Sequence, residues 1–266
     1  MAEWSKGKGR RVLVLLGLIV FLSASFLTFD WAQYFLDQVR ISDPELMYTR
    51  VTKTLASFLV FLLALSVGAD GLEPADTRRL RHAFVAIFCG DLLFLLDEAH
   101  PAFDFPAVLA FLVGQVLIIL RNGQGLGDYL RAKSAAGGLG RDVAIGAGIL
   151  LMTAVLFVGT LLEHLRGSPM LPIIAVYAIV LDLSLWTGWM ALRTGHFPRR
   201  NAALIAAGAT CFFVGDYLVG FNLSLEPSLQ RATTVFLTWV FYTPAITLFA
   251  LSGYRWSAEG MAERAP

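Results

Sequence analysis

Charged residues are scarce in this chain. Only 15% of its 266 residues are Asp, Glu, Lys or Arg, against about 25% in an ordinary soluble domain. The formal net charge of +1 excludes a protein that binds nucleic acid by neutralising its phosphates. Two cysteines are too few for a disulfide scaffold or a four-cysteine zinc site. Because 57% of the residues are hydrophobic, we expect a single integral membrane domain over residues 1–266, with the bilayer as its surroundings.

Long apolar runs occupy most of the sequence. A helix needs about 20 apolar residues to cross the hydrocarbon core, and windows of this size predict an all-α, polytopic bundle of eight transmembrane helices. The predicted spans are approximately 12–29, 51–68, 83–97, 102–120, 142–162, 170–192, 201–221 and 229–252. The third window is shorter than the others and contains a charged residue. We interpret the first window as a retained helix rather than a cleaved signal peptide.

Basic residues are distributed unequally between the two sides of this topology. Most Lys and Arg residues fall at the N-terminus, at the C-terminus and in the loops 69–82, 121–141 and 193–200. The opposite side has only Arg40, Arg50, Lys53, Arg166 and Arg231. Because positive charge is retained on the cytoplasmic side, we expect both termini to be cytoplasmic, in a multi-pass protein of a bacterial inner membrane.

Two segments between the spans have distinctive compositions. Residues 30–50 mix polar residues with Trp31, Tyr34 and Phe35. This composition predicts a segment that lies in the membrane interface on the outer face. Residues 123–140 are rich in Gly, Ala and Ser, which predicts a flexible cytoplasmic linker.

Ionisable side chains inside the predicted spans are the main functional signal, because each is costly in a bilayer. Asp91, Asp182 and Asp216 lie within spans, and Lys53 lies just inside the outer end of the second span. Each Asp has a structural interpretation as well, as a group that bonds a neighbour and fixes the packing. Lys53 is equally compatible with extending to the interface or with pairing to a carboxylate or a lipid phosphate.

Asp91 and Asp216 share their surroundings. Residues 88–93 read Phe-Cys-Gly-Asp-Leu-Leu, and residues 213–218 read Phe-Val-Gly-Asp-Tyr-Leu. The two segments lie four predicted helices apart, in helices that run in the same direction. This match suggests two parallel four-helix halves. The glycine before each Asp would let a neighbouring backbone approach, and such a bundle could bring both carboxylates to one cavity.

Other side chains add weaker signals. Tyr177, Trp239 and Tyr242 lie in spans and could donate hydrogen bonds to a substrate, although tyrosine and tryptophan are also common packing residues. The histidines stand at span ends or in loops, at His82, His100, His164 and His196. We predict no metal site and no cofactor.

Several short motifs, taken in order, resemble the YhhN family of membrane proteins, which includes the lysoplasmalogenases. They are Thr-Lys-Thr-Leu at 52–55, Gly-Asp at 90–91, the segment 208–216 that ends in Gly-Asp, Tyr177, and Trp239, Tyr242, Ala245 and residues 248–252 in the last helix. The resemblance covers about residues 50–253 and implies an eight-helix bundle.

The chain also departs from the pattern of that family. Thr54 stands where the family usually has proline, and Gly215 where a serine commonly precedes the Asp. Gln115 replaces an expected histidine, and Ile246 an expected glutamine. These changes alter the polar side chains of the implied cavity, so the resemblance fits a diverged member with another substrate, or one without activity.

The resemblance implies hydrolysis of the vinyl-ether bond of a lysoplasmalogen, a lysophospholipid, to a fatty aldehyde and glycerophospho-ethanolamine or -choline. Asp91 and Asp216 would be the acid and the base, because this reaction needs one carboxyl to donate a proton and another to orient water. We expect the substrate-binding residues to be Lys53, Gln115, Tyr177, Asp182, Trp239 and Tyr242. Two other functions remain open, a proton-coupled transporter and a catalytically inactive lipid-binding protein.

Overall fold

The computed structural model describes residues 6–37, 47–97, 100–222, 225–226 and 228–256. In these residues the regular elements are helices. The long ones are α1 (Lys6–Trp31), α2 (Met47–Leu65), α3 (Pro74–Asp97), α4 (Asp104–Asn122), α6 (Gly140–Leu156), α8 (Leu171–Thr194), α9 (Arg199–Asn222) and α10 (Leu229–Leu251). The shorter ones are α5 (Leu126–Ala135) and α7 (Leu162–Leu165). The predicted all-α class is confirmed.

Seven of these helices are long and apolar enough to cross a membrane. The long helix outside this group is α3, whose first two turns carry Asp76, Arg78, Arg79 and Arg81. Large apolar side chains such as Leu13, Phe21 and Leu151 point outward and are about two-thirds exposed. An apolar exterior is expected where lipid rather than water surrounds a protein. The chain is therefore an integral, multi-pass membrane protein.

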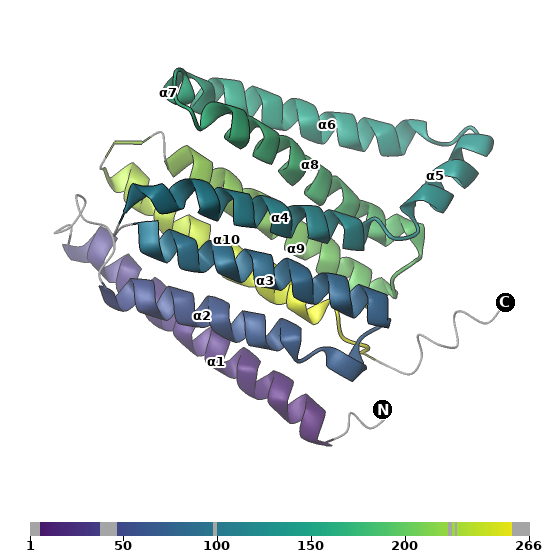
Figure 1. Ribbon diagram of the computed structural model, residues 1–266, viewed down its shortest axis with the longest axis horizontal. Coiled ribbons are helices and arrows are strands. Elements are labelled where there is room, and N and C mark those ends of the chain that lie inside the picture. Colours follow the sequence, from purple (N-terminus) through teal and green to yellow (C-terminus); the bar gives the residue numbers. More distant parts are fainter. Residues whose placement is uncertain (1–5, 38–46, 98–99, 223–224, 227, 257–266) are drawn as a thin grey trace.

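The long helices pack side by side with their axes roughly aligned (Figure 1). The most extensive contacts join α9 to α10 and α3 to α4. Helix α8 packs on α9 and α4, whereas α2 packs on α3 and α10. Helices α1 and α6 lie at opposite edges of the bundle, against α2 and α8 respectively.

Small residues set the closest helix contacts, as is usual in membranes. A Cβ atom on Gly188 of α8 would lie 2.5 Å from the Cβ of Ala209 on α9. A Cβ atom on Gly208 of α9 would lie 3.2 Å from the carbonyl oxygen of Ala245 on α10. Helix α9, which carries Asp216, is therefore held tightly between α8 and α10.

Two sequence-based expectations for the connecting segments are wrong. Residues 30–37 continue α1 as helix and a π-helical turn, with Asp30 and Tyr34 buried, so they do not form a separate interfacial segment; residues 38–46 lie outside the described part of the chain. The expected linker at 123–140 contains α5. Helix α5 is joined to the start of α6 by Tyr129, whose hydroxyl donates to Asp142 Oδ2 at 2.9 Å.

A buried polar network closes one end of the bundle, which we call the basic end. Both described chain ends lie there, together with the end of α2 and the starts of α3 and α9 (Figure 1). Arg121 is fully buried and donates from Nε to Asp76 at 2.7 Å and from Nη1 to Ser252 Oγ at 2.7 Å. Burial raises the pKa of the nearby Tyr254 hydroxyl, which donates to the Leu63 carbonyl at 2.8 Å. This network joins α2, α3, α4 and the segment after α10.

Candidate functional site

Asp91 and Asp216 lie at matching depths in the bundle. Asp91 is six residues before the end of α3, and Asp216 is six residues before the end of α9. Both helices begin at the basic end, so their last residues lie at the opposite, distal end (Figure 1). At 1.5 Å per residue, each Asp is about 9 Å along its helix from that end.

A tyrosine from a neighbouring helix holds each carboxyl. The Tyr242 hydroxyl of α10 donates to Asp91 Oδ1 at 2.7 Å, and the Tyr177 hydroxyl of α8 donates to Asp216 Oδ2. Asp216 also interacts electrostatically with Asp91, and Tyr242 interacts with both carboxyls and with Tyr177. Side chains from four helices thus form one group, which we call the carboxyl cluster.

The carboxyl cluster adjoins a partly exposed part of the bundle. Asp91, Asp216 and Tyr177 are partly exposed, whereas Tyr242 is buried. Residues 216–222 of α9 and 235–241 of α10 are all partly exposed. These are the distal halves of two helices that pack against each other. Part of the side-chain surface of both helices therefore stays accessible between the cluster and the distal end.

The glycines before the two aspartates serve two different contacts. A Cβ atom on Gly215 would lie 3.4 Å from the backbone nitrogen of Tyr242, an ordinary contact, so the α10 backbone lies beside Gly215 without requiring a glycine there. At Gly90 the neighbour is instead the ring of Phe111 on α4, only 2.5 Å from such an atom. That ring packs edge-on against Tyr242 with its centroid 6.1 Å away. Gly90 therefore shapes the support of the tyrosine that holds Asp91.

Lys53 does not extend to the interface. It is only 1% exposed, and its Nζ lies 3.0 Å from Oδ2 of Asp30, which is also buried. The same Nζ lies over the Trp239 ring, 5.3 Å from the centroid, and Trp239 packs edge-on against Tyr242 at 5.5 Å. One aromatic ring therefore separates the ion pair from the carboxyl cluster. Sequence reasoning missed Asp30, although an acidic residue at the end of an apolar run was the available signal.

Two predicted site residues have other surroundings. Asp182 accepts a hydrogen bond at 2.6 Å from Thr153 of α6, on the side of α8 that faces the edge of the bundle. Gln115 of α4 is fully buried, and neither its Oε1 nor its Nε2 has a hydrogen-bond partner among the described residues. Neither side chain shares a hydrogen bond with the carboxyl cluster, whose tyrosines, by contrast, were both proposed from the sequence.

Two positions that depart from the family pattern are accommodated by local contacts. Ile246 is 1% exposed and belongs to the main apolar core. The Thr54 hydroxyl donates to the Arg50 carbonyl, one turn earlier in α2, at 3.0 Å. Both side chains thus serve packing or helix structure. In the described residues, no three His, Cys, Asp or Glu side chains come together in a way that could hold a metal ion.

Comparison with known proteins identifies one family. The model of the YhhN family matches residues 48–253, from the start of α2 to just beyond α10, which includes every helix of the carboxyl cluster. Asp30 and the rest of α1 lie outside the matched residues. No curated protein and no solved structure matches the chain.

Proposed function

The chain belongs to the YhhN family, and from this premise we propose that it is a membrane hydrolase that cleaves the vinyl-ether bond of lysoplasmalogens. The observation that carries the proposal is the carboxyl cluster, in which Asp91 and Asp216 interact at matching depths of α3 and α9. Two carboxyls in one low-dielectric site can divide the acid and base roles between them.

The reaction adds one water molecule across the vinyl ether. One carboxylic acid transfers its proton to the outer carbon of the double bond, which leaves an oxocarbenium ion at the carbon attached to oxygen. The other carboxylate faces this cation and takes a proton from the attacking water, as in glycoside hydrolysis. The resulting hemiacetal separates into a fatty aldehyde and the glycerol hydroxyl, and a proton exchange between the two carboxyls restores the starting state.

The remaining members of the site hold these groups in place. Tyr177 and Tyr242 fix the orientation of Asp216 and Asp91 through their hydroxyls. We assign Lys53 a positioning role through Trp239, because its charge is paired with Asp30. The partly exposed segments 216–222 and 235–241 are the proposed route for the alkenyl chain, since they adjoin the cluster and lead to the distal end.

We also infer that the bundle is a parallel repeat of two four-helix halves. Helix α3 packs on α4 as α9 packs on α10, α1 covers α2 as α6 covers α8, and the two halves meet through α4 with α8 and α10 with α2. These matching neighbours support the repeat proposed from the Gly-Asp motifs. By the distribution of Lys and Arg, we place the basic end and both termini in the cytoplasm of a bacterium.

Measuring aldehyde release tests the proposal. The purified protein in detergent micelles is given lysoplasmalogen, and the aldehyde is quantified with a coupled alcohol dehydrogenase. Because general acid–base groups contribute about 10²–10⁴-fold to rate, Asp91→Asn and Asp216→Asn should each lower turnover by at least about 100-fold.

Two controls make this experiment specific. Asp128→Asn removes a carboxyl that is 88% exposed at the basic end, and it should keep wild-type turnover. A saturated-ether analogue has no double bond to protonate, so it should release no aldehyde. Wild-type turnover in either cluster variant contradicts the proposal.

A proton-coupled transporter is the second candidate, because interacting carboxyls within a membrane also suit a proton relay. Proteoliposomes distinguish the two functions. Uptake of lysophospholipid that depends on a proton gradient, with no aldehyde formed, supports the transporter and contradicts the hydrolase.

A further inference from the structure

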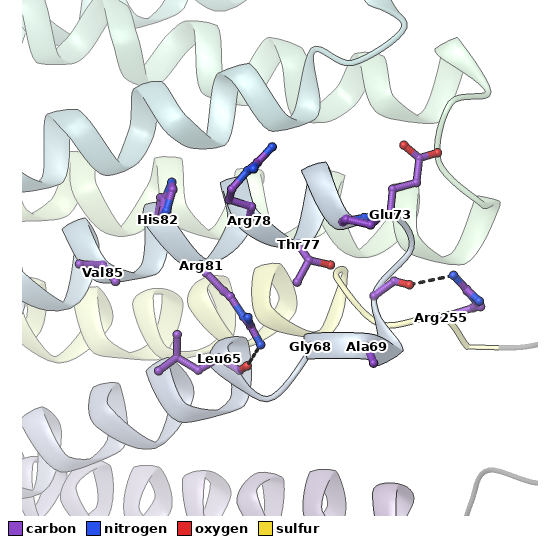
Figure 2. A pocket seen from close by; sticks show the side chains of 12 residues that line it. Leu65, Gly68, Ala69, Glu73, Thr77, Arg78, Arg81, His82, Val85 and Arg255 are labelled. Atoms are coloured by element: carbon purple, nitrogen blue, oxygen red, sulfur yellow. Dashed lines mark hydrogen bonds between the residues drawn. The ribbon is translucent and has the colours of Figure 1, made fainter.

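A pocket of about 720 Å³ lies at the basic end between the end of α2 and the start of α3. It is separate from the carboxyl cluster, which lies near the distal end. Its volume falls within the range of about 300–1,000 Å³ that is typical of small-molecule sites. Figure 2 shows Arg81 and Thr77 reaching from α3 towards the Gly68–Ala69 segment, with Arg255 approaching from the segment after α10.

The lining of this pocket is strongly basic. Arg78, Arg81 and Arg255 line it, against a single acidic side chain, the exposed Glu73. The neighbouring carboxylate of Asp76 does not reduce this excess, because it is already paired with Arg121. Asp70, between the lining residues Ala69 and Gly71, is a further carboxylate and already interacts within the protein. Three arginines against Glu73 and Asp70 leave an excess of positive charge that favours an anion.

Two polar groups beside the pocket have no hydrogen-bond partner in the described part of the chain, and a third is fixed in place. Arg81 uses Nη2 to donate to the Leu65 carbonyl at 2.5 Å, but its buried Nε has no partner among the described residues. The Thr77 hydroxyl, on a side chain only 5% exposed, is likewise without a partner among them. Arg255 is fixed by donating from Nη2 to the carbonyls of Gly71 and Leu72 at 3.0 and 3.1 Å. Guanidinium groups held in this way match the oxygens of a phosphate.

The position of the pocket indicates a lipid rather than a free anion. Leu65 is the last residue of a candidate membrane span, so the pocket lies where hydrocarbon gives way to water. Leu65 and Val85 supply an apolar wall, and Val85 is 45% exposed, as a side chain facing acyl chains would be. A basic mouth beside an apolar wall fits an amphiphile with a phosphate head.

We propose that this pocket binds the phosphate group of an anionic phospholipid from the leaflet at the basic end. Arg81, Arg255 and Thr77 hold the phosphate, Arg78 adds charge at the rim, and an acyl chain follows Val85 along α3. Such a lipid would join α2, α3 and the segment after α10. Basic pockets between transmembrane helices are known to recognise anionic head groups in this way.

Lipid titration followed by native mass spectrometry tests this proposal in delipidated full-length protein. The probes are saturated diacyl phosphatidylglycerol, phosphatidylcholine with the same chains, and inorganic phosphate. The lipid probes have no vinyl ether, so the result does not depend on the proposed hydrolase activity. The wild-type protein should bind one phosphatidylglycerol at least about tenfold more tightly than phosphatidylcholine, since each nearby arginine contributes about fivefold.

Variants locate the binding to the pocket. Arg81→Gln with Arg255→Gln keeps side chains that can donate hydrogen bonds but removes two charges, and should weaken phosphatidylglycerol binding about 25-fold. Arg79→Gln removes the same charge from α3 outside the pocket lining, and should change the affinity less than twofold. If the double variant does not fold, Arg78→Gln, on an exposed side chain, should still weaken binding about fivefold.

Two outcomes would overturn the proposal. Equal weakening by Arg79→Gln and by the pocket variants would mean that diffuse surface charge holds the lipid. Displacement of phosphatidylglycerol by an equal concentration of inorganic phosphate would mean that the pocket takes a free anion.

Discussion

Replacing the buried ion pair between Lys53 and Asp30 by apolar side chains tests the structure. Nζ of Lys53 lies 3.0 Å from Oδ2 of Asp30, and Coulomb's law with an effective dielectric constant of about 20 gives an attraction of about 5.5 kcal/mol. Desolvation offsets much of this attraction, because both groups are almost inaccessible. Removing only one partner leaves a buried charge without compensation and costs about 3–5 kcal/mol.

Three variants separate the pair from its individual members. Lys53→Met and Asp30→Leu should each lower the free energy of unfolding by about 3–5 kcal/mol. The double variant replaces the pair by apolar side chains of similar shape, so its stability should return to within about 1 kcal/mol of wild type. Reversible unfolding in mixed detergent micelles, followed by circular dichroism, measures all four proteins.

The same variants report on function. If Lys53 acts only by holding Trp239 beside Tyr242, the double variant should regain part of the aldehyde-releasing activity as its stability recovers. Single variants within about 1 kcal/mol of wild type, or costs that simply add in the double variant, would refute the buried pair.

Two further perturbations follow from the packing. Gly90→Ala forces a Cβ atom against the Phe111 ring and should destabilise the protein by about 1–3 kcal/mol. Gly215→Ala meets only ordinary contacts and should change stability by less than about 1 kcal/mol. Thermal unfolding compares the two variants, and equal effects would argue against the α3–α4 contact. Thr153→Val removes the hydrogen bond to Asp182 and should cost about 0.6–1.7 kcal/mol. The same loss in an Asp182→Leu background, which has no acceptor for the Thr153 hydroxyl, would show that the bond contributes nothing.

The sequence predicted the helices well because hydropathy reports directly on burial in lipid. The windows 102–120, 170–192, 201–221 and 229–252 lie within or overlap α4, α8, α9 and α10 almost completely. Helix α3 is the exception. A hydropathy window does not detect its polar first turns, which are helical in the structure and held by tertiary contacts such as the one between Asp76 and Arg121. Helix α5 was missed because its glycine-rich flanks suggested a linker.

The site was predicted in part because a charged residue stands out within an apolar run. Charge inside a span identified Asp91 and Asp216. Tyr177 and Tyr242 were proposed as hydrogen-bond donors within spans and also matched the family resemblance, and the structure places them on those carboxyls. No sequence pattern gives the partner of a side chain on a distant helix, so Asp30 was not connected with Lys53. For the same reason, the contact of Asp182 with Thr153 emerged only from the packing of α6 on α8.

The most direct test of the central claim is a turnover experiment in D₂O with rapid trapping of the aldehyde. Proton transfer from an Asp to carbon predicts one deuterium at carbon 2 of the aldehyde released by the wild-type protein, and at least about 100-fold less aldehyde from Asp91→Asn and from Asp216→Asn. Aldehyde without deuterium at carbon 2, or undiminished release from either variant, would contradict acid–base catalysis by this pair.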